Sequence, residues 1–362
     1  MTSPDRKTAP AENTPIVELN NVSRRRFLQT AMVAAPVWAT VGRSAEKSAT
    51  PRPLGPLDDP GVRIVALDDR FEQLIDRGEV ITRHQTGSKW SEGPAWNAAG
   101  RYLVWSDVPN SRQWRWLEED GHVSEFRHPT GRTNGSTFDH EGRMISCQQE
   151  GRCVVRHEGD GSVTILANQA DGVSLASPND VVVHPDGSIW FTDAGYGVPK
   201  PLPQKEAIYR IDGVTGSLKR VDNSLVKPNG LCFSPDFSKL YVADTGPAEQ
   251  ADKALHVFDV TEDGGLANRR HFAAIRHNGL IAGPDGQQVD ADGNLWASSG
   301  HSVEGINGVH VFAPDGKLLG VILLPETCAN VCFGGTDRDR LFMTATTSLY
   351  SVRTKTRGAH GS

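Results

Sequence analysis

Hydrophobic and polar positions follow one recurring pattern through most of the chain. Each repeat opens with a side-chain oxygen, runs about eight residues to a turn and continues into a short apolar run: YLVW, MISC, IWFT, LYVA, LWAS or LFMT. The opening residues are Glu92, Asn134, Asn179, Asn229, Asp285 and Asn330, spaced by 42, 45, 50, 56 and 45 residues. Repeats of this period predict an all-β fold, a six-bladed β-propeller.

The expected strand order places the opening residues together. The first strand of each repeat should lie at the propeller axis, and the second should run antiparallel to it. The loops after the second strands therefore surround the same mouth as the opening residues. Tyr196 and His301 lie in two of these loops, and we predict that both line a substrate pocket there.

The ends of the chain are expected to close the ring. The last repeat ends near Val352, which leaves it short for four strands. We expect the N-terminal run near 62–80 to complete this last blade, because joining the two ends leaves no open sheet edge. The predicted propeller then spans 61–353, with a proline-rich linker at 46–60 and a C-terminal tail at 354–362.

The N-terminus has the pattern of an export signal. Residues 23–29 read SRRRFLQ, which matches the twin-arginine pattern, and a modest apolar stretch follows from Thr30 to Val41. Residues 1–45 are therefore predicted to be a twin-arginine signal peptide, although a basic disordered tail is the alternative. A chain exported by the twin-arginine machinery would be periplasmic or secreted.

Charge argues against some classes of partner. The formal charge of the whole chain is −6; residues 1–45 carry six basic and three acidic groups, so the remaining 32 basic and 41 acidic groups give the body −9. An acidic body without basic clusters argues against nucleic acid as partner. No apolar run reaches the roughly 18 residues that a membrane helix needs, so we expect no membrane span.

The five cysteines are expected to be buried thiols. Cys147 and Cys153 flank a turn and could pair across a hairpin, whereas Cys232, Cys328 and Cys332 are isolated in the sequence. Folding in a reducing cytosol before export disfavours a disulfide between the first two.

Four of the opening residues are candidate metal ligands: Glu92, Asn179, Asn229 and Asp285. Carboxylate and amide oxygens are the ligands that Ca²⁺ prefers, and these positions lack the sulfur or imidazole that soft metals favour. We predict one divalent cation, with Ca²⁺ preferred over Mg²⁺, Mn²⁺ or Zn²⁺. The alternative is that each Asn-Gly or Asp-Gly pair is simply a turn.

Two further acids, Asp193 and Asp244, follow second strands directly. Their position is equally typical of a residue that accepts hydrogen bonds from a turn and of a residue that takes part in chemistry.

Several segments together resemble the SMP-30/gluconolactonase/luciferin-regenerating family. They are SEGPAW, RTNGSTFDHEGR, SPNDVVVHPDGSIWFTD, KPNGLCFSPD, AGPDGQQVDADGNLW and NVCFGG, in the expected order between about 90 and 345. The resemblance implies a six-bladed propeller with a catalytic divalent metal on Glu92, Asn179, Asn229 and Asp285. It also implies that Asp285 acts as base or orients water. Arg132 and Asn134 resemble the substrate-contacting Arg-x-Asn-Gly of bacterial gluconolactonases, whereas Ser177 replaces an arginine that some animal relatives carry.

The predicted function is that of a metal-dependent hydrolase that opens a sugar lactone to the aldonic acid. A phosphotriesterase of the diisopropyl-fluorophosphatase kind would use the same ring of oxygens, and a propeller that binds calcium without catalysis is a further alternative. The fold alone does not choose among them, because propellers have many functions.

Overall fold

The computed structural model describes residues 55–56, 59, 61–246, 253–300 and 302–360. The predicted signal peptide, most of the predicted linker and His301 lie outside these residues. The described residues all belong to one compact unit, 49–362. No helix in the described ranges has the length and apolar character that crossing a membrane would require.

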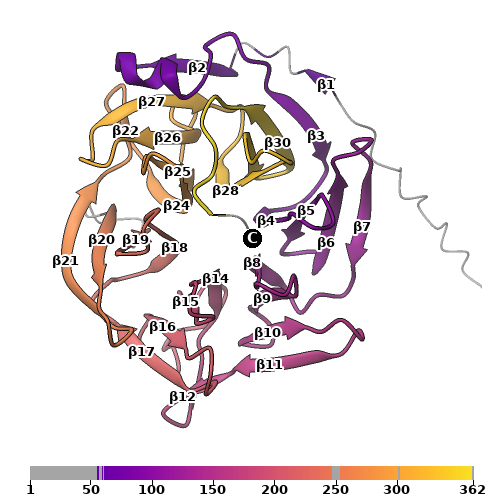
Figure 1. Cartoon of the computed structure of the whole chain (residues 1–362), viewed down its shortest axis with the longest axis vertical. Coiled ribbons are helices and arrows are strands. Elements are labelled where there is room, and N and C mark those ends of the chain that lie inside the picture. The colour runs from indigo at the N-terminus through magenta and orange to yellow at the C-terminus, as the bar shows by residue number, and fades with distance from the viewer. Residues whose placement is uncertain (1–54, 57–58, 60, 247–252, 301, 361–362) are drawn as a thin grey trace, which may run out of the picture. The chain divides into compact units, whose positions relative to one another are not determined.

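Six antiparallel sheets stand around a common axis, which confirms the six-bladed propeller (Figure 1). Each sheet begins at the axis with a strand that carries one opening residue of the sequence repeat. The inner strands are β4 (Ser91–Asn97), β8 (Thr133–Phe138), β14 (Pro178–Val183), β18 (Pro228–Phe233), β24 (Gly283–Val289) and β28 (Cys328–Gly334).

The second strands carry the apolar runs identified in the sequence and pair with the inner strands. They are β5 (Tyr102–Asp107), β9 (Met144–Gln148), β15 (Ile189–Asp193), β19 (Lys239–Asp244), β25 (Leu295–Gly300) and β29 (Arg340–Ala345). The third strands are β6 (Arg112–Leu117), β10 (Cys153–His157), β16 (Ala207–Ile211), β20 (Ala254–Val260), β26 (Gly308–Phe312) and β30 (Ser348–Arg353).

Fourth strands complete the first five blades: β7 (Val123–Arg127), β11 (Val163–Ala167), β17 (Leu218–Asp222), β21 (Leu266–Ala273) and β27 (Leu318–Leu323). Two short hairpins lie between blades. They are formed by β12 (Gln169–Ala170) with β13 (Val173–Ser174), and by β22 (Arg276–His277) with β23 (Leu280–Ile281).

An N-terminal strand closes the last blade, as predicted, but it is not the run near 62–80. The closing strand is β3 (Thr82–Thr86), which pairs with β30, and β1 (Gly55–Pro56) pairs with β3 in turn. The earlier run instead supplies β2 (Arg63–Ala66), a fifth strand on the blade of β24 to β27. After β2, the Asp68 side chain accepts a hydrogen bond from the Arg70 amide and caps a short 3-10 helix, Asp69–Gln73, which ends the extended run.

Apolar side chains pack between neighbouring blades. Six separate hydrophobic clusters of buried residues are present among the described residues, and each joins two adjacent blades. The cluster between the last and first blades contains Trp96, Trp105, Trp116 and Phe342. This packing holds the two ends of the chain together at the closure.

The C-terminal segment after β30 returns across the propeller instead of leaving it. The Thr354 amide donates to the Asp339 carbonyl, and the Ala359 amide donates to the Val289 carbonyl of β24. Figure 1 shows this end of the chain arriving near the axis. The five cysteines are all buried free thiols, as expected, so Cys147 and Cys153 do not pair.

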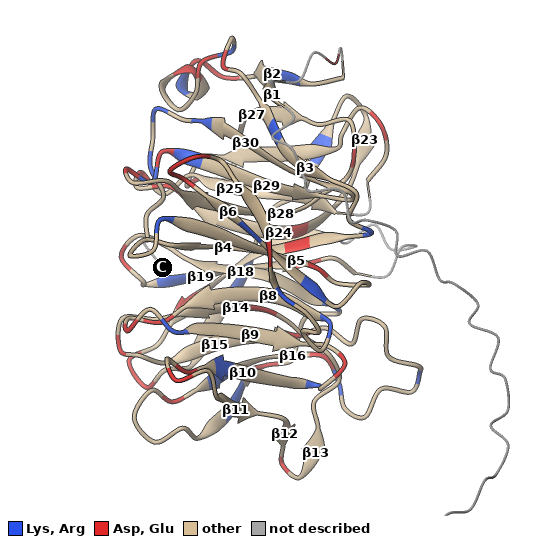
Figure 2. Ribbon diagram, turned by 90° about the vertical axis from the view of Figure 1, so that its right-hand side faces the viewer, with Lys and Arg blue, Asp and Glu red and all other residues tan. Residues whose placement is uncertain are grey.

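Charged residues of both signs are distributed over the loops. Figure 2 shows acidic and basic segments interspersed along the turns of the propeller. The ion pairs in the described part of the chain include exposed ones, such as Lys219 with Asp263 at 3.5 Å. Such exposed pairs contribute at most about 1 kcal/mol each, so the apolar clusters dominate the stability.

The closure of the ring contains a buried histidine with a pH-dependent contribution. His84 of β3 shares a 2.7 Å hydrogen bond with Ser351 of β30, and its ring lies 5.2 Å from that of Trp116. Burial, with a smaller effect from Arg340, lowers the pKa of His84 to about 4. The unfolded chain therefore takes up this proton first, and stability is lost as the pH falls from about 6.5 towards 4.

We predict that His84→Gln weakens this acid sensitivity. Between pH 7 and pH 5 the parent should lose about 2 kcal/mol of unfolding free energy that the variant keeps. Urea unfolding at the two pH values measures the difference. The exposed His122 provides the matched control, His122→Gln. Equal losses in the parent and in His84→Gln would contradict the assignment.

Candidate functional site

The opening residues of the repeats lie at β-bulges in the inner strands. The pairing register between inner and second strands shifts between Glu92 and Ala95, between Pro178 and Val181, and correspondingly in the other four blades. A bulge re-aims side chains and is common beside active sites. The four predicted ligands are almost fully buried, with exposures of 2–4% for Glu92, Asn179, Asn229 and Asp285.

The glycines after these residues serve close approach between blades, not turns. A Cβ on Gly93 would lie 2.1 Å from the Asn134 carbonyl oxygen, and one on Gly230 would lie 2.2 Å from the Asp285 carbonyl oxygen. Only a residue without a side chain allows adjacent inner strands to come so near. The alternative that these pairs are simple turns is therefore wrong, because each lies within a strand.

A chain of amide hydrogen bonds runs around the axis from blade to blade. Asn134 Nδ2 donates to Asn179 Oδ1 at 2.7 Å, and Asn179 Nδ2 donates to Asn229 Oδ1. Asn229 Nδ2 then donates to the Tyr196 hydroxyl at 3.0 Å and to the Thr245 hydroxyl at 2.9 Å. Residues that are 45 and 50 positions apart in sequence are thus brought into direct contact.

Three carboxylates share the same buried space. Burial and the charge of Asp180 raise the pKa of Glu92, and burial together with the charges of Glu92 and Asp180 raises the pKa of Asp285. Burial also raises the pKa of Asp180. Asn330 joins two of them, because its side-chain Nδ2 donates to Glu92 Oε2 at 3.2 Å and to Asp180 Oδ2 at 2.9 Å.

This donor set suits a hard cation. Among the described residues no Lys or Arg forms an ion pair with these three carboxylates, and buried charge without a counter-charge is costly. Asn134 Oδ1 is also buried without a hydrogen-bond partner in the described structure. The described ranges contain no cluster of three or more His, Cys, Asp or Glu side chains placed to hold a metal. The residues that could hold a divalent ion therefore combine two carboxylates, Glu92 and Asp285, with amide oxygens, the mixture that Ca²⁺ accepts.

The predicted substrate-binding residues have different positions. Asn134 and Tyr196 belong to the hydrogen-bonded ring described above. Arg132 precedes β8, is exposed, and has a left-handed backbone with φ of 54°, held by a 3.0 Å hydrogen bond from its amide to Ser111 Oγ. A non-glycine residue at such a φ is often found near functional sites. Nothing is described of His301.

Asp180 was not predicted as a site residue from the sequence, and Asn330 was given no role there. Asp180 occupies the place that glycine takes in four of the other repeats, directly after an opening residue. This departure from glycine was the signal that could have identified Asp180. A side chain at a position where inner strands approach closely must contact the neighbouring strand. Thr245 was also missed; its hydroxyl accepts from Asn229 and donates to the Pro284 carbonyl at 2.9 Å, linking the ring to β24.

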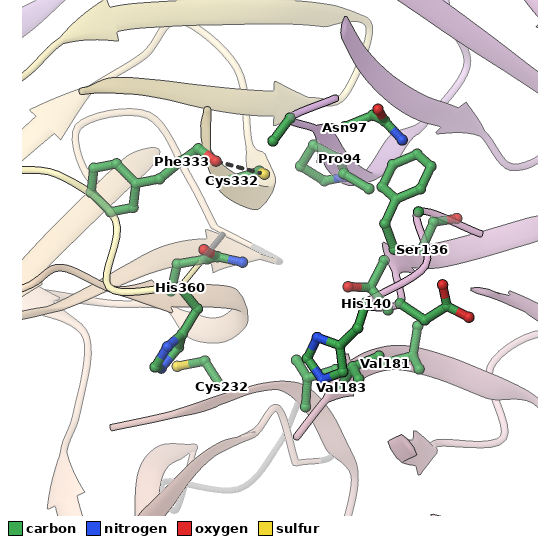
Figure 3. Close-up of a pocket in the computed structure, with 18 of the residues that line it drawn as sticks. Pro94, Asn97, Ser136, His140, Val181, Val183, Cys232, Cys332, Phe333 and His360 are labelled. Carbon is green, nitrogen blue, oxygen red and sulfur yellow. Dashed lines mark hydrogen bonds between the residues drawn. The ribbon is translucent and has the colours of Figure 1, made fainter. Parts of the chain in front are cut away.

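A separate cavity of about 480 Å³ lies at the opposite ends of the inner strands (Figure 3). Its walls include Asn97 at the end of β4, Val183 at the end of β14 and His140 in the turn after β8. None of the four predicted ligands lines it. We therefore do not take this cavity as the candidate site. The buried carboxylates and amides converge at the other end of the inner strands.

Comparison with known proteins agrees with this architecture. The gluconolactonase of Zymomonas mobilis is 28% identical over 321 residues, covering 82% of this chain and 87% of the relative. Pentonolactonase XacC of Haloferax volcanii is 28% identical over 266 residues, covering 72% and 82%. A solved gluconolactonase from Xanthomonas campestris has 35% identity and a TM-score of 0.73, covering 84% of this chain and 98% of that one.

Two further comparisons concern the fold and the family. A regucalcin structure from Agrobacterium tumefaciens, with 18% identity and a TM-score of 0.61 over 75% of this chain and 92% of that one, shares the fold. The family profile described as "SMP-30/Gluconolactonase/LRE-like region" matches residues 90–347. This match includes the inner strand of every blade and all the residues of the amide and carboxylate ring, so the chain belongs to the SMP-30/gluconolactonase/LRE-like family.

Proposed function

We propose that this protein is a hydrolase that opens a sugar lactone to the corresponding aldonic acid, and that it requires one divalent cation. The observation that carries the proposal is the buried ring of amide and carboxylate oxygens at one mouth of the propeller, with no basic residue paired to its acids among the described residues. The relatives named as gluconolactonase and pentonolactonase support the substrate class.

The chemistry of the donors favours Ca²⁺ as the cation. We assign its ligands as Glu92, Asn179, Asn229 and Asp285, all buried and mutually close. Two carboxylates balance a doubly charged ion, and the amide oxygens add dipoles without further charge. A divalent ion held by these residues would supply Lewis-acid chemistry, which favours attack at the lactone carbonyl and stabilises negative charge on its oxygen.

The protein's own residues have complementary roles. Asp285 is the proposed base, which takes a proton from the water that attacks the carbonyl carbon. The bond between that carbon and the ring oxygen breaks, the ring oxygen gains a proton, and a hydroxy acid results. Asn134, Tyr196 and Arg132 would bind the sugar hydroxyls. The Asn330 side chain donates to the carboxylates of both Glu92 and Asp180, and so orients the Glu92 carboxylate.

A lactone panel tests this proposal directly. Protein stripped with EDTA should acidify an indicator solution containing glucono-1,5-lactone no faster than the protein-free blank, and added Ca²⁺ should restore hydrolysis more fully than Mg²⁺, Mn²⁺ or Zn²⁺. The panel should include diisopropyl fluorophosphate. Faster turnover of the organophosphate than of every lactone would replace the proposal by a phosphotriesterase. A cation that stabilises the fold without any hydrolysis would indicate a calcium-binding propeller.

Glu92→Gln should weaken Ca²⁺ binding roughly 100-fold or more, because it removes one of the two ligand charges. In the parent, free Ca²⁺ at 100 times its Kd should add about 2.7 kcal/mol of unfolding free energy, and the variant should gain almost nothing at the same concentration. Differential scanning calorimetry measures both. The exposed Glu119 gives the control Glu119→Gln, which should respond like the parent. An undiminished response in Glu92→Gln would contradict the assigned ligand.

Arg132→Ala should lower kcat/KM for an aldonolactone about 10- to 100-fold, the value of one charge-assisted hydrogen bond of about 1.5–3 kcal/mol. Its thermal midpoint should not change, because the side chain is exposed. Steady-state kinetics beside the matched control Arg276→Ala, another exposed arginine, separates a specific contact from general charge. Equal kinetics for the two variants would argue against a substrate contact by Arg132.

We also propose that residues 1–45 direct export by the twin-arginine route, supported by the SRRRFLQ run. Replacing Arg24 and Arg25 together by lysine should retain the protein in the cytoplasm of a bacterial host, as cell fractionation would show. The matched control replaces Arg6 and Arg43 by lysine, outside the motif, and should still be exported. Export of both proteins to the same extent would refute the signal.

A further inference from the structure

Three buried aspartates occupy equivalent positions at the ends of second strands. Asp107, Asp193 and Asp244 are the last residues of β5, β15 and β19, with exposures of 2%, 0% and 5%. None of the three is among the ligands assigned above. Each faces the loop that enters the inner strand of its own blade.

Each carboxylate accepts two backbone hydrogen bonds from that loop. Asp193 binds the amides of Ala176 and Ser177 at 2.7 and 2.5 Å. Asp244 binds the amides of Val226 and Lys227 at 2.9 and 2.8 Å.

Asp107 makes the same contacts in the first blade, with the amides of Lys89 and Trp90 at 3.1 and 3.4 Å. In all three blades the bound amides are those three and two residues before Asn179, Asn229 or Glu92. The spacing from carboxylate contact to assigned ligand is therefore identical.

A third hydrogen bond completes each arrangement. The amide that follows the aspartate donates back to the loop: Ala194 to the Ser177 carbonyl at 3.3 Å, Thr245 to the Lys227 carbonyl at 3.1 Å, and Val108 to the Trp90 carbonyl at 3.1 Å. The loop is thus held from both sides, and its path into the bulge is fixed.

The arrangement is confined to blades with an assigned ligand. In the second blade the equivalent position is Gln148, and in the sixth blade, where Thr346 donates to the Thr327 carbonyl, no carboxylate takes this place. The fifth blade differs because its inner strand continues its regular pairing past Asp285, with Gly283 opposite Gly300. The aspartates therefore accompany the three ligands that follow irregular loops.

We propose that Asp107, Asp193 and Asp244 are positioning residues, which fix the entry loops so that Glu92, Asn179 and Asn229 present their oxygens to one cation. This inference rests on the proposed function. The residue type is required because a carboxylate has only acceptors and satisfies two amide donors at once, whereas an asparagine would turn its own NH₂ group towards one of them. An amide left unsatisfied in a buried loop would let the loop move, and the ligand three residues later would move with it.

The test compares Asp193→Asn with Asp290→Asn. Asp290 is also fully buried and accepts backbone amides, from Asp292 at 3.1 Å and Asn294 at 2.9 Å, but it lies in the turn after β24, at the opposite end of that strand from Asp285. Both variants should lower the thermal midpoint. Only Asp193→Asn should weaken Ca²⁺ binding, roughly 10- to 100-fold as for outer-shell partners of metal ligands.

Calcium affinity is measured by calorimetric titration of the EDTA-stripped, full-length protein, prepared without an unfolding step. Lactone turnover is a second readout. Saturating Ca²⁺ should restore much of the turnover of Asp193→Asn. Asp244→Asn provides a second variant should the first fail to fold. Unchanged affinity in the aspartate variants, or an equal loss in Asp290→Asn, would overturn the positioning role while leaving the proposed function intact. A parent protein that binds no divalent cation would overturn both.

Discussion

Three carboxylates buried together at the mouth of the propeller set the main constraint on this structure. Burial raises the pKa values of Glu92, Asp180 and Asp285, and neighbouring carboxylate charge raises those of Glu92 and Asp285 further. No basic side chain in the described ranges forms an ion pair with them. Inner strands pack so closely there that glycine is needed beside the carboxylates. The fold thus concentrates negative charge in a place that water reaches poorly, and a bound cation would relieve this cost.

The surrounding architecture keeps this unfavourable arrangement in place. Six apolar clusters join the blades in a ring, and the closing strand β3 bonds the N-terminal part of the propeller to its last blade. Bulges at the axis turn the opening side chains inward, and amide contacts link them from one blade to the next. Stability comes from the blade interfaces, so the axis is free to carry groups that stabilise a ligand instead of the fold.

Much of this was predictable from the sequence, and the failures have physical causes. The repeat period and the phase of its oxygens predicted the number of blades and the meeting of Asn134, Asn179 and Asn229. The closing strand was placed too early because the run near 62–80 supplies β2 to the neighbouring blade and then, from the cap at Asp68, a short 3-10 helix. Asp180 stands out in the sequence only by replacing the glycine of four other repeats; its contact with Asn330, 150 positions away, follows from the fold.

A crystal structure of the protein grown with Ca²⁺ tests the central claim most directly. We expect one ion whose anomalous density lies about 2.3–2.6 Å from oxygens of Glu92, Asn179, Asn229 and Asp285. An ion bound elsewhere, or a site at which these four side chains keep their mutual hydrogen bonds in saturating Ca²⁺ and no ion is seen, would contradict it.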